Sequence, residues 1–153
     1  MKCKWHILSG AILAIILVYF FEFSVIEGVA TFLASFLVDL DHYPWYAVSF
    51  RDWNPFHALR WHNQTIDRRN SISVKEKAKF QRGVFVLHSL VVWIVLGFLS
   101  SINTLSLSIF LGFSLHIVAD LITLAYYNEP LYTKLFPCLV IIRNKNKKPL
   151  KEL

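Results

Sequence analysis

Long apolar runs, separated by short polar connections, dominate the chain. From Gly83 to Ala119 there is no Asp, Glu, Lys or Arg, and residues 100–104 (two serines, an asparagine and a threonine around one isoleucine) interrupt this stretch in the middle. A helix that crosses a bilayer needs about 20 mostly apolar residues, so the stretch predicts two spanning helices joined by a turn. Over the whole chain the pattern predicts four hydrophobic segments, at 7–23, 25–40, 83–99 and 105–127.

The composition supports a membrane protein. Hydrophobic residues make up 56% of the chain and charged residues 17%, whereas a soluble domain carries about 25% charged residues. We therefore expect an all-α fold, an integral membrane bundle of about four transmembrane helices that forms a single domain over 1–153. Cys3 and Cys138 form no Cys-x-x-Cys motif and both are expected near the cytoplasmic side, so we expect reduced thiols. No small-residue cleavage site ends the first apolar run, so we expect no cleaved signal peptide.

Lys and Arg occur in alternate connections. They lie before the first segment, in the loop 51–82 and in the basic tail 138–153, and they are absent from the connections between segments one and two and between segments three and four. Because cytoplasmic loops carry the excess of Lys and Arg, we predict a multi-pass protein of the cell membrane with both termini cytoplasmic. The loop should be an amphipathic, partly helical segment at the lipid surface, with His57 and His62 solvated or interfacial. This topology explains the net charge of +6, so membrane lipids and not nucleic acid are the expected partners.

Seven titratable side chains lie in or next to the predicted spanning segments. Burying such groups in a bilayer costs free energy, so their presence indicates a functional site. In the predicted topology all of them fall in the cytoplasmic half of the membrane. They are His6, Asp39, Asp41, His42, His88, His116 and Asp120. Imidazole combined with carboxylate is the ligand set of zinc, manganese or iron sites. We therefore predict a divalent metal site built from these residues, with zinc as the first choice and manganese or iron as alternatives.

The spacing of these residues agrees with a shared site. His116 and Asp120 are four residues apart, so they share a helix face and can hold one ion. Asp39 and Asp41 would point to opposite sides of a regular helix. Pro44 disfavours helical conformation at the residue before it. We therefore predict that the helix ends here and that the acidic pair lies on a helix-terminal loop that presents ligands.

These residues resemble the motifs of a family of membrane-bound metal-dependent hydrolases, the YdjM-like family. In that family a His-containing first helix, an Asp-x-Asp-His element, a Thr-His-Ser element and a His-x-x-x-Asp-x-x-Thr element follow one another. The matching residues are His6, Asp39 to His42, His88–Ser89, and His116 with Asp120 and Thr123. Val38 and Leu87 stand where the family usually has Pro and Thr.

The resemblance implies a metal-dependent hydrolase that acts at the cytoplasmic membrane face through metal-activated water. We expect Asp41, His42 and His88 to be the catalytic residues. The substrate would be a phosphate-bearing lipid or another ester, because basic residues flank the expected site. They are Arg51, Lys79 and Arg82.

Two other functions remain open from the sequence. A metal or proton transporter would usually place its ligands near the midplane and show internal repeats, and this chain has one-sided ligands and no repeat. A structural or partner-binding membrane protein could hold a metal for stability, in which case its coordination shell would be closed. The metal's identity, the number of ions, the substrate and the oligomeric state are left open.

Overall fold

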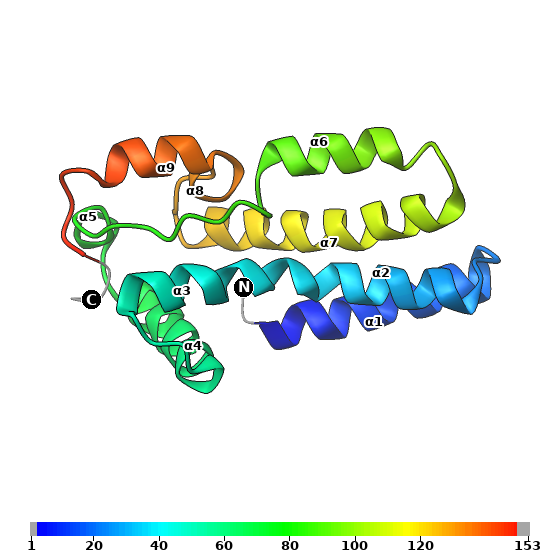
Figure 1. Ribbon diagram of the computed structural model, residues 1–153, viewed down its shortest axis with the longest axis horizontal. Helices are drawn as coiled ribbons and strands as arrows, with labels where there is room; N and C mark the ends of the chain where they lie inside the picture. Colours follow the sequence, from blue (N-terminus) through cyan, green and yellow to red (C-terminus); the bar gives the residue numbers. More distant parts are fainter. Residues whose placement is uncertain (1–2, 150–153) are drawn as a thin grey trace. The chain divides into compact units, whose positions relative to one another are not determined.

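The computed structural model describes residues 3–149, which form α-helices and no β-strand (Figure 1). The all-α prediction is therefore confirmed for this part of the chain. The helices and the 3₁₀ turn η1 are α1 (Cys3–Phe20), α2 (Val25–Leu37), η1 (Val38–Asp41), α3 (His42–Phe50), α4 (Pro55–Ser71), α5 (Val74–Lys77), α6 (Leu90–Leu99), α7 (Thr104–Tyr126), α8 (Tyr132–Leu135) and α9 (Pro137–Asn144).

The chain divides into two compact units. Unit 1 contains the chain up to Asp39 together with Leu90–Thr123, and unit 2 contains Leu40–Ser89 together with the chain from Leu124 onward. Unit 1 therefore holds α1, α2, α6 and most of α7, and unit 2 holds the remaining helices. The expectation of a single domain stays a prediction.

In unit 1, α1 and α2 form a hairpin whose turn is fixed by a capping box at Ser24. The backbone N–H of Glu27 donates to Ser24 Oγ at 3.3 Å, and the backbone N–H of Ser24 donates to Glu27 Oε2 at 2.7 Å. Such a reciprocal pair satisfies N–H groups that a helix start leaves without intrahelical partners. Glu22 adopts a positive φ of 59°, which lets the chain reverse directly after α1. The sequence placed the break between the first two segments at this point.

Small residues let the helices of unit 1 approach closely. A Cβ on Gly10 of α1 would lie 1.8 Å from Ser35 Oγ of α2, and a Cβ on Gly112 of α7 would lie 2.1 Å from the carbonyl oxygen of Thr31 on α2. Thr31 Oγ1 donates to the carbonyl oxygen of Ser108 on α7 at 3.1 Å. Close backbone approach and interhelical hydrogen bonds are the means by which helices associate without a hydrophobic driving force.

The third expected segment, 83–99, is helical only in α6, which begins at Leu90. Residues 81–85 have no regular secondary structure, and the carboxy-terminal part of the chain pairs with Gln81 and Arg82 inside unit 2. The backbone N–H of Arg82 donates to Asn144 Oδ1 at 3.0 Å, and the backbone N–H of Gln81 donates to the carbonyl oxygen of Lys148 at 2.8 Å. This pairing is non-local, so the hydropathy of the segment alone could not indicate it.

Unit 2 is organised around aromatic side chains. The Trp61 ring on α4 lies 4.9 Å from the Phe50 ring and 5.4 Å from the Trp45 ring on α3, measured between centroids. Asn54 caps α4 by accepting the backbone N–H of Phe56 at 2.9 Å. The loop expected at 51–82 therefore contains a full helix, whose single tryptophan, Trp61, packs against aromatic rings of α3.

Two helices, α1 and α7, are long and apolar enough to cross a membrane. By contrast, α2 has 13 residues and α6 has 10, fewer than the roughly 20 that a perpendicular span needs. Large apolar side chains point outward from both candidate spans, for example Ile12 and Ile15 on α1 and Ile122 on α7. By length and composition alone, the structure supports two of the four expected spans.

Candidate metal centre

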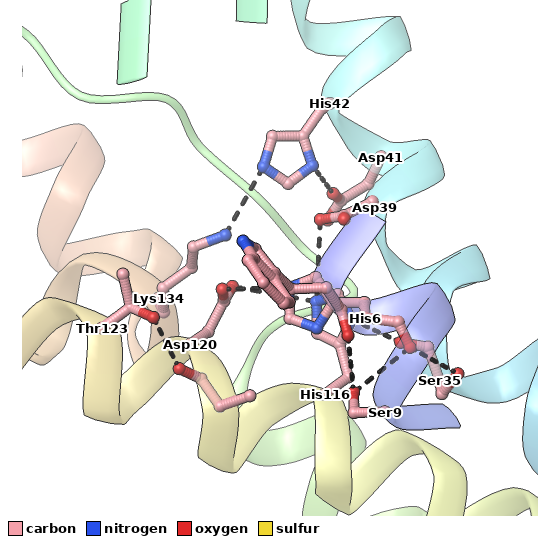
Figure 2. Close-up of polar contacts among 12 residues, drawn as sticks. His6, Ser9, Ser35, Asp39, Asp41, His42, His116, Asp120, Thr123 and Lys134 are labelled. Atoms are coloured by element: carbon pink, nitrogen blue, oxygen red, sulfur yellow. Dashed lines mark hydrogen bonds and ion pairs between the residues drawn. The ribbon is translucent and has the colours of Figure 1, made fainter. Parts of the chain in front are cut away.

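Four of the predicted ligands come together at one end of unit 1 (Figure 2). His6 lies in the first turn of α1, Asp39 lies on η1 two residues after α2, and His116 and Asp120 lie one turn apart on α7. The side chains of His6, His116 and Asp120 are 1%, 0% and 2% exposed, and that of Asp39 is 14% exposed. Three separate stretches of sequence thus deliver two imidazoles and two carboxylates to one buried place.

The separations of the donor atoms fit a single ion. His6 Nε2 lies 3.3 Å from Asp120 Oδ1, and His116 Nε2 lies 3.6 Å from Asp39 Oδ1 and 3.7 Å from Asp120 Oδ2. One donor atom each from His6, Asp39 and His116 lie within 4.8 Å of one another. Two ligands of one tetrahedral ion, each 2.0–2.2 Å from it, are roughly 3.3–3.6 Å apart. The cluster is therefore geometrically compatible with a divalent metal site.

The orientation of His116 is set by a backbone group. His116 Nδ1 lies 2.8 Å from the carbonyl oxygen of Ser35 on α2. A carbonyl can only accept, so Nδ1 carries a proton, and in the neutral ring Nε2 presents its lone pair toward Asp39 and Asp120. Metal-ligating histidines usually have such a partner on the second nitrogen, because it fixes the tautomer and the ring orientation.

The surroundings of His6 also fit a metal ligand. Its ring stacks on the ring of His116 with centroids 3.8 Å apart and an interplanar angle of 19°. Neither ring nitrogen of His6 makes a hydrogen bond to a described residue, although the side chain is buried. A buried polar atom without a hydrogen bond is costly. His6 Nε2 lies 3.3 Å from Asp120 Oδ1, so a metal ion held by both would give this nitrogen a ligand bond.

The other three predicted site residues form a second cluster, inside unit 2. Asp41 Oδ2 lies 3.2 Å from His88 Nδ1 and accepts the backbone N–H of Leu87 at 3.0 Å, and Asp41 Oδ1 lies 3.1 Å from His42 Nδ1. Burial acts to raise the pKa of Asp41, but the hydrogen bonds from His42 and His88 outweigh it and hold that pKa well below its usual range. Asp41 is therefore an anionic acceptor between two imidazoles.

His42 has further neighbours in unit 2 that the sequence did not indicate. Its ring stacks on Phe85 with centroids 3.9 Å apart and meets the edge of His62 at 4.6 Å. Lys134 Nζ lies 3.4 Å from His42 Nε2. His62, which we expected to be solvated or interfacial, is thus in contact with this cluster. His57 is exposed as expected, and its Nδ1 lies 2.9 Å from Asp52 Oδ2.

The prediction for the acidic pair was correct about the helix end and wrong about its cause. The helix α2 stops at Leu37 and gives way to the 3₁₀ turn, but α3 begins immediately at His42 with Pro44 in its first turn. Proline is tolerated there because the first N–H groups of a helix have no intrahelical acceptor. Within unit 1 Asp39 contacts His116, and within unit 2 Asp41 contacts His42 and His88.

Two of the basic residues expected beside the site have acidic partners of their own in unit 2. Lys79 Nζ lies 2.7 Å from Glu76 Oε2, and Arg82 Nη1 donates to Glu129 Oε2. Arg51 is exposed and adopts a positive φ of 55° at the end of α3. Lys134, which the sequence did not indicate, is a cation that lies next to His42 within unit 2.

Comparisons with known proteins give no further constraint on the site. No protein-family model, no curated protein and no solved structure matches this chain. The resemblance in motif order therefore stays a prediction, and the metal centre is supported by its geometry.

Proposed function

We propose that the protein is a membrane-embedded metal-dependent hydrolase that acts at the cytoplasmic face of the cell membrane. The observation that carries this proposal is the spacing of two histidines and two aspartates in unit 1, between 3.3 and 3.7 Å for neighbouring donor atoms. A divalent ion held there would lower the pKa of a bound water and supply hydroxide near neutral pH.

The membrane placement rests on α1 and α7, whose outward-facing side chains are apolar. The shorter α2 and α6 complete a bundle of four spanning segments in this proposal. The basic connections put both termini and the loop 51–82 in the cytoplasm. The end of unit 1 that carries the metal ligands then lies toward the cytoplasm, because His6 is near the amino terminus of α1.

The Asp41 cluster of unit 2 is suited to move protons. The Asp41 carboxylate lies 3.2 Å from His88 Nδ1 and orients the His88 ring. His42, hydrogen-bonded to the other oxygen of Asp41, is oriented in the same way. We propose that His88 and His42 serve as general base and general acid, with Asp41 as the residue that positions both. The substrate class is a phosphate-bearing lipid or another ester.

The first test is the metal content of the detergent-purified protein. Wild type and a Glu76→Gln control, which removes an exposed carboxylate of unit 2, should bind close to one equivalent of zinc, manganese or iron. Asp120→Asn and His116→Ala should lose that metal while keeping wild-type helix content. Absence of bound metal in the wild type, even after incubation with excess of each ion, would contradict the hydrolase.

A structural metal site is the second candidate function. Four buried donors from His6, Asp39, His116 and Asp120 would complete a tetrahedral shell, and closed shells are typical of structural zinc. Chelation should then lower the melting temperature strongly, and no phosphoester or lipid ester should be hydrolysed by the metal-loaded protein. Turnover of an ester that stops when His88 is replaced by Gln would favour the hydrolase instead.

A further inference from the structure

A single carboxylate, Glu129, is surrounded by three cations in unit 2. Arg69 Nη2 lies 3.0 Å from Glu129 Oε1, and Arg82 Nη1 donates to Glu129 Oε2. Lys77 Nζ lies 3.9 Å from Glu129 Oε1. The side chains of Lys77 and Glu129 are 4% and 8% exposed. Each oxygen of the carboxylate is thus paired with a different arginine, and the ammonium group of Lys77 lies near the oxygen that Arg69 contacts.

The charges of this group do not balance. Among the ion pairs described for this group, one carboxylate faces three cations, and Lys77 Nζ donates a hydrogen bond at 3.3 Å to the neutral carbonyl oxygen of Tyr127. Burial lowers the pKa of Arg69, and the nearby charge of Arg82 lowers it as well, against the favourable effect of Glu129. Two guanidinium groups that repel each other in a partly buried place would be stabilised by a further anion.

Each arginine also has one buried nitrogen that makes no hydrogen bond to the described residues. Arg69 Nη1 and Arg82 Nε are buried atoms and make no hydrogen bond to any residue that the structure describes. The two side chains remain 15% and 11% exposed, so a ligand can reach them from the surface. Guanidinium groups present their N–H donors in a planar fork that matches the oxygen atoms of phosphate or carboxylate.

We propose that Arg69, Lys77 and Arg82 form a binding site for a phosphate group, with Glu129 as a carboxylate that neutralises part of their charge and competes with the phosphate. The surplus of two positive charges favours a phosphate monoester, which carries about −1.5 to −2 at neutral pH, over a singly charged carboxylate. The ligand is either the headgroup of a phosphomonoester lipid or free phosphate. Binding here does not depend on the metal centre of unit 1.

The test uses inorganic phosphate as the probe and thermal unfolding of the detergent-purified full chain as the readout, at constant ionic strength set with chloride. Phosphate should raise the melting temperature of the wild type. Loss of one charged hydrogen-bonding partner should weaken the apparent affinity about 10- to 100-fold, so Arg69→Gln and Arg82→Gln should need correspondingly more phosphate. Arg68→Gln, which removes the adjacent exposed arginine, should respond like wild type.

Two further variants keep the outcome decisive if an arginine variant fails to fold. Glu129→Gln should bind phosphate more tightly than wild type, because the competing carboxylate is gone. Asp120→Asn, which alters the metal centre, should keep the phosphate response, and this separates the present proposal from the proposed hydrolase. An equal response of wild type and Arg69→Gln, or weaker binding by Glu129→Gln, would overturn the site.

A second set of unfolding measurements, with lipids in place of inorganic phosphate, identifies the source of the phosphate group. Mixed micelles that contain phosphatidic acid should stabilise the wild type at lower concentrations than inorganic phosphate if the ligand is a lipid headgroup, and phosphatidylglycerol should have a weaker effect. Stabilisation by inorganic phosphate alone would identify a soluble ligand. If neither probe distinguishes wild type from Arg82→Gln, the three cations serve only to hold Glu129 and the proposal is wrong.

Discussion

His116 donates its Nδ1–H to the main-chain carbonyl oxygen of Ser35 at 2.8 Å, which ties the proposed metal ligand on α7 to the backbone of α2. Because the acceptor belongs to the backbone, the orientation of the imidazole depends on the position of α2. The position of α2 depends in turn on Gly10 of α1, because α1 and α2 approach so closely there that a Cβ on residue 10 would collide with Ser35.

The first prediction is that Gly10→Ala weakens metal binding without removing any ligand. The added Cβ would lie 1.8 Å from Ser35 Oγ and 2.6 Å from Ser35 Cβ, so α2 must shift and carry the Ser35 carbonyl with it. Loss of a partner that orients a ligand typically reduces metal affinity 10- to 100-fold, and we expect a loss of about this size. Competition titration with a metal chelator measures it.

The matched control is Gly97→Ala on α6. There the added Cβ would meet the Phe110 ring at 3.5 Å, an ordinary contact, so metal affinity should stay at the wild-type value. Equal affinities of the Gly10 variant and wild type would show that the Ser35 carbonyl does not orient His116.

The second prediction concerns the stability of unit 1. In Gly112→Ala the new Cβ would lie 2.1 Å from the carbonyl oxygen of Thr31, a backbone atom that cannot rotate away. Overpacking of this kind costs about 1–3 kcal/mol, so the melting temperature in detergent should fall by several degrees. Gly97→Ala should melt within a degree of wild type, and the same result for Gly112→Ala would contradict the close approach of α2 and α7.

Local spacing was sufficient to predict part of the site. The pair His116 and Asp120 follows from helix geometry, because residues four apart share a face, and the structure has their side chains in contact. The partners of Asp39 and Asp41 could not be predicted in this way. They are decided by the 3₁₀ turn that follows Leu37, and a single proline did not reveal that a new helix starts there.

Non-local contacts account for the other differences. Arg82 was expected to face a substrate, and its partner Glu129 lies 47 residues further along the chain. Likewise, the shortened third segment results from pairing with Asn144, 62 residues away. Hydropathy and charge patterns describe residues that are close in sequence, so they could not predict the contacts of Arg82 with Glu129 and Asn144.

The third prediction is a pH dependence that originates at Glu129. Burial acts to raise the pKa of Glu129, but the charges of Arg69 and Arg82 outweigh it, and the net pKa is lower than the ordinary 4.5. A carboxyl group with a lowered folded-state pKa stabilises the fold above its unfolded-state pKa, and this stabilisation is lost as the pH falls through the folded-state value. The wild type should therefore lose stability below about pH 4.5.

Glu129→Gln tests the origin of this dependence. The variant should be less stable than wild type at pH 7, and the difference in melting temperature should narrow steadily on acidification, because the wild-type carboxyl becomes protonated. Parallel curves for the two proteins across the acidic range would assign the pH dependence to other carboxylates.

The fourth prediction tests the orientation in the membrane. Cys138 is exposed near the start of α9, and the proposed topology puts it on the cytoplasmic side. In a Cys3→Ser background, a membrane-impermeant maleimide should label it in inside-out vesicles and leave it unmodified in right-side-out vesicles. Ser101→Cys, placed in the exposed connection between α6 and α7, should show the opposite pattern when combined with Cys138→Ser. Labelling of Cys138 from the outside would reverse the topology.

The shortness of α6 has a consequence for the surrounding lipid. Ten residues of helix extend about 15 Å, whereas the hydrocarbon layer is about 30 Å thick. Trp93, in the first turn of α6, donates to Ser114, and α6 lies along the amino-terminal part of α7 (Figure 1). In the proposed membrane placement, hydrophobic mismatch then makes the bilayer thin locally toward the cytoplasm. The protein should therefore favour thin, fluid membranes. In such membranes the lipid headgroups next to α6 would lie closer to the centre of the bilayer than they do in a thicker membrane.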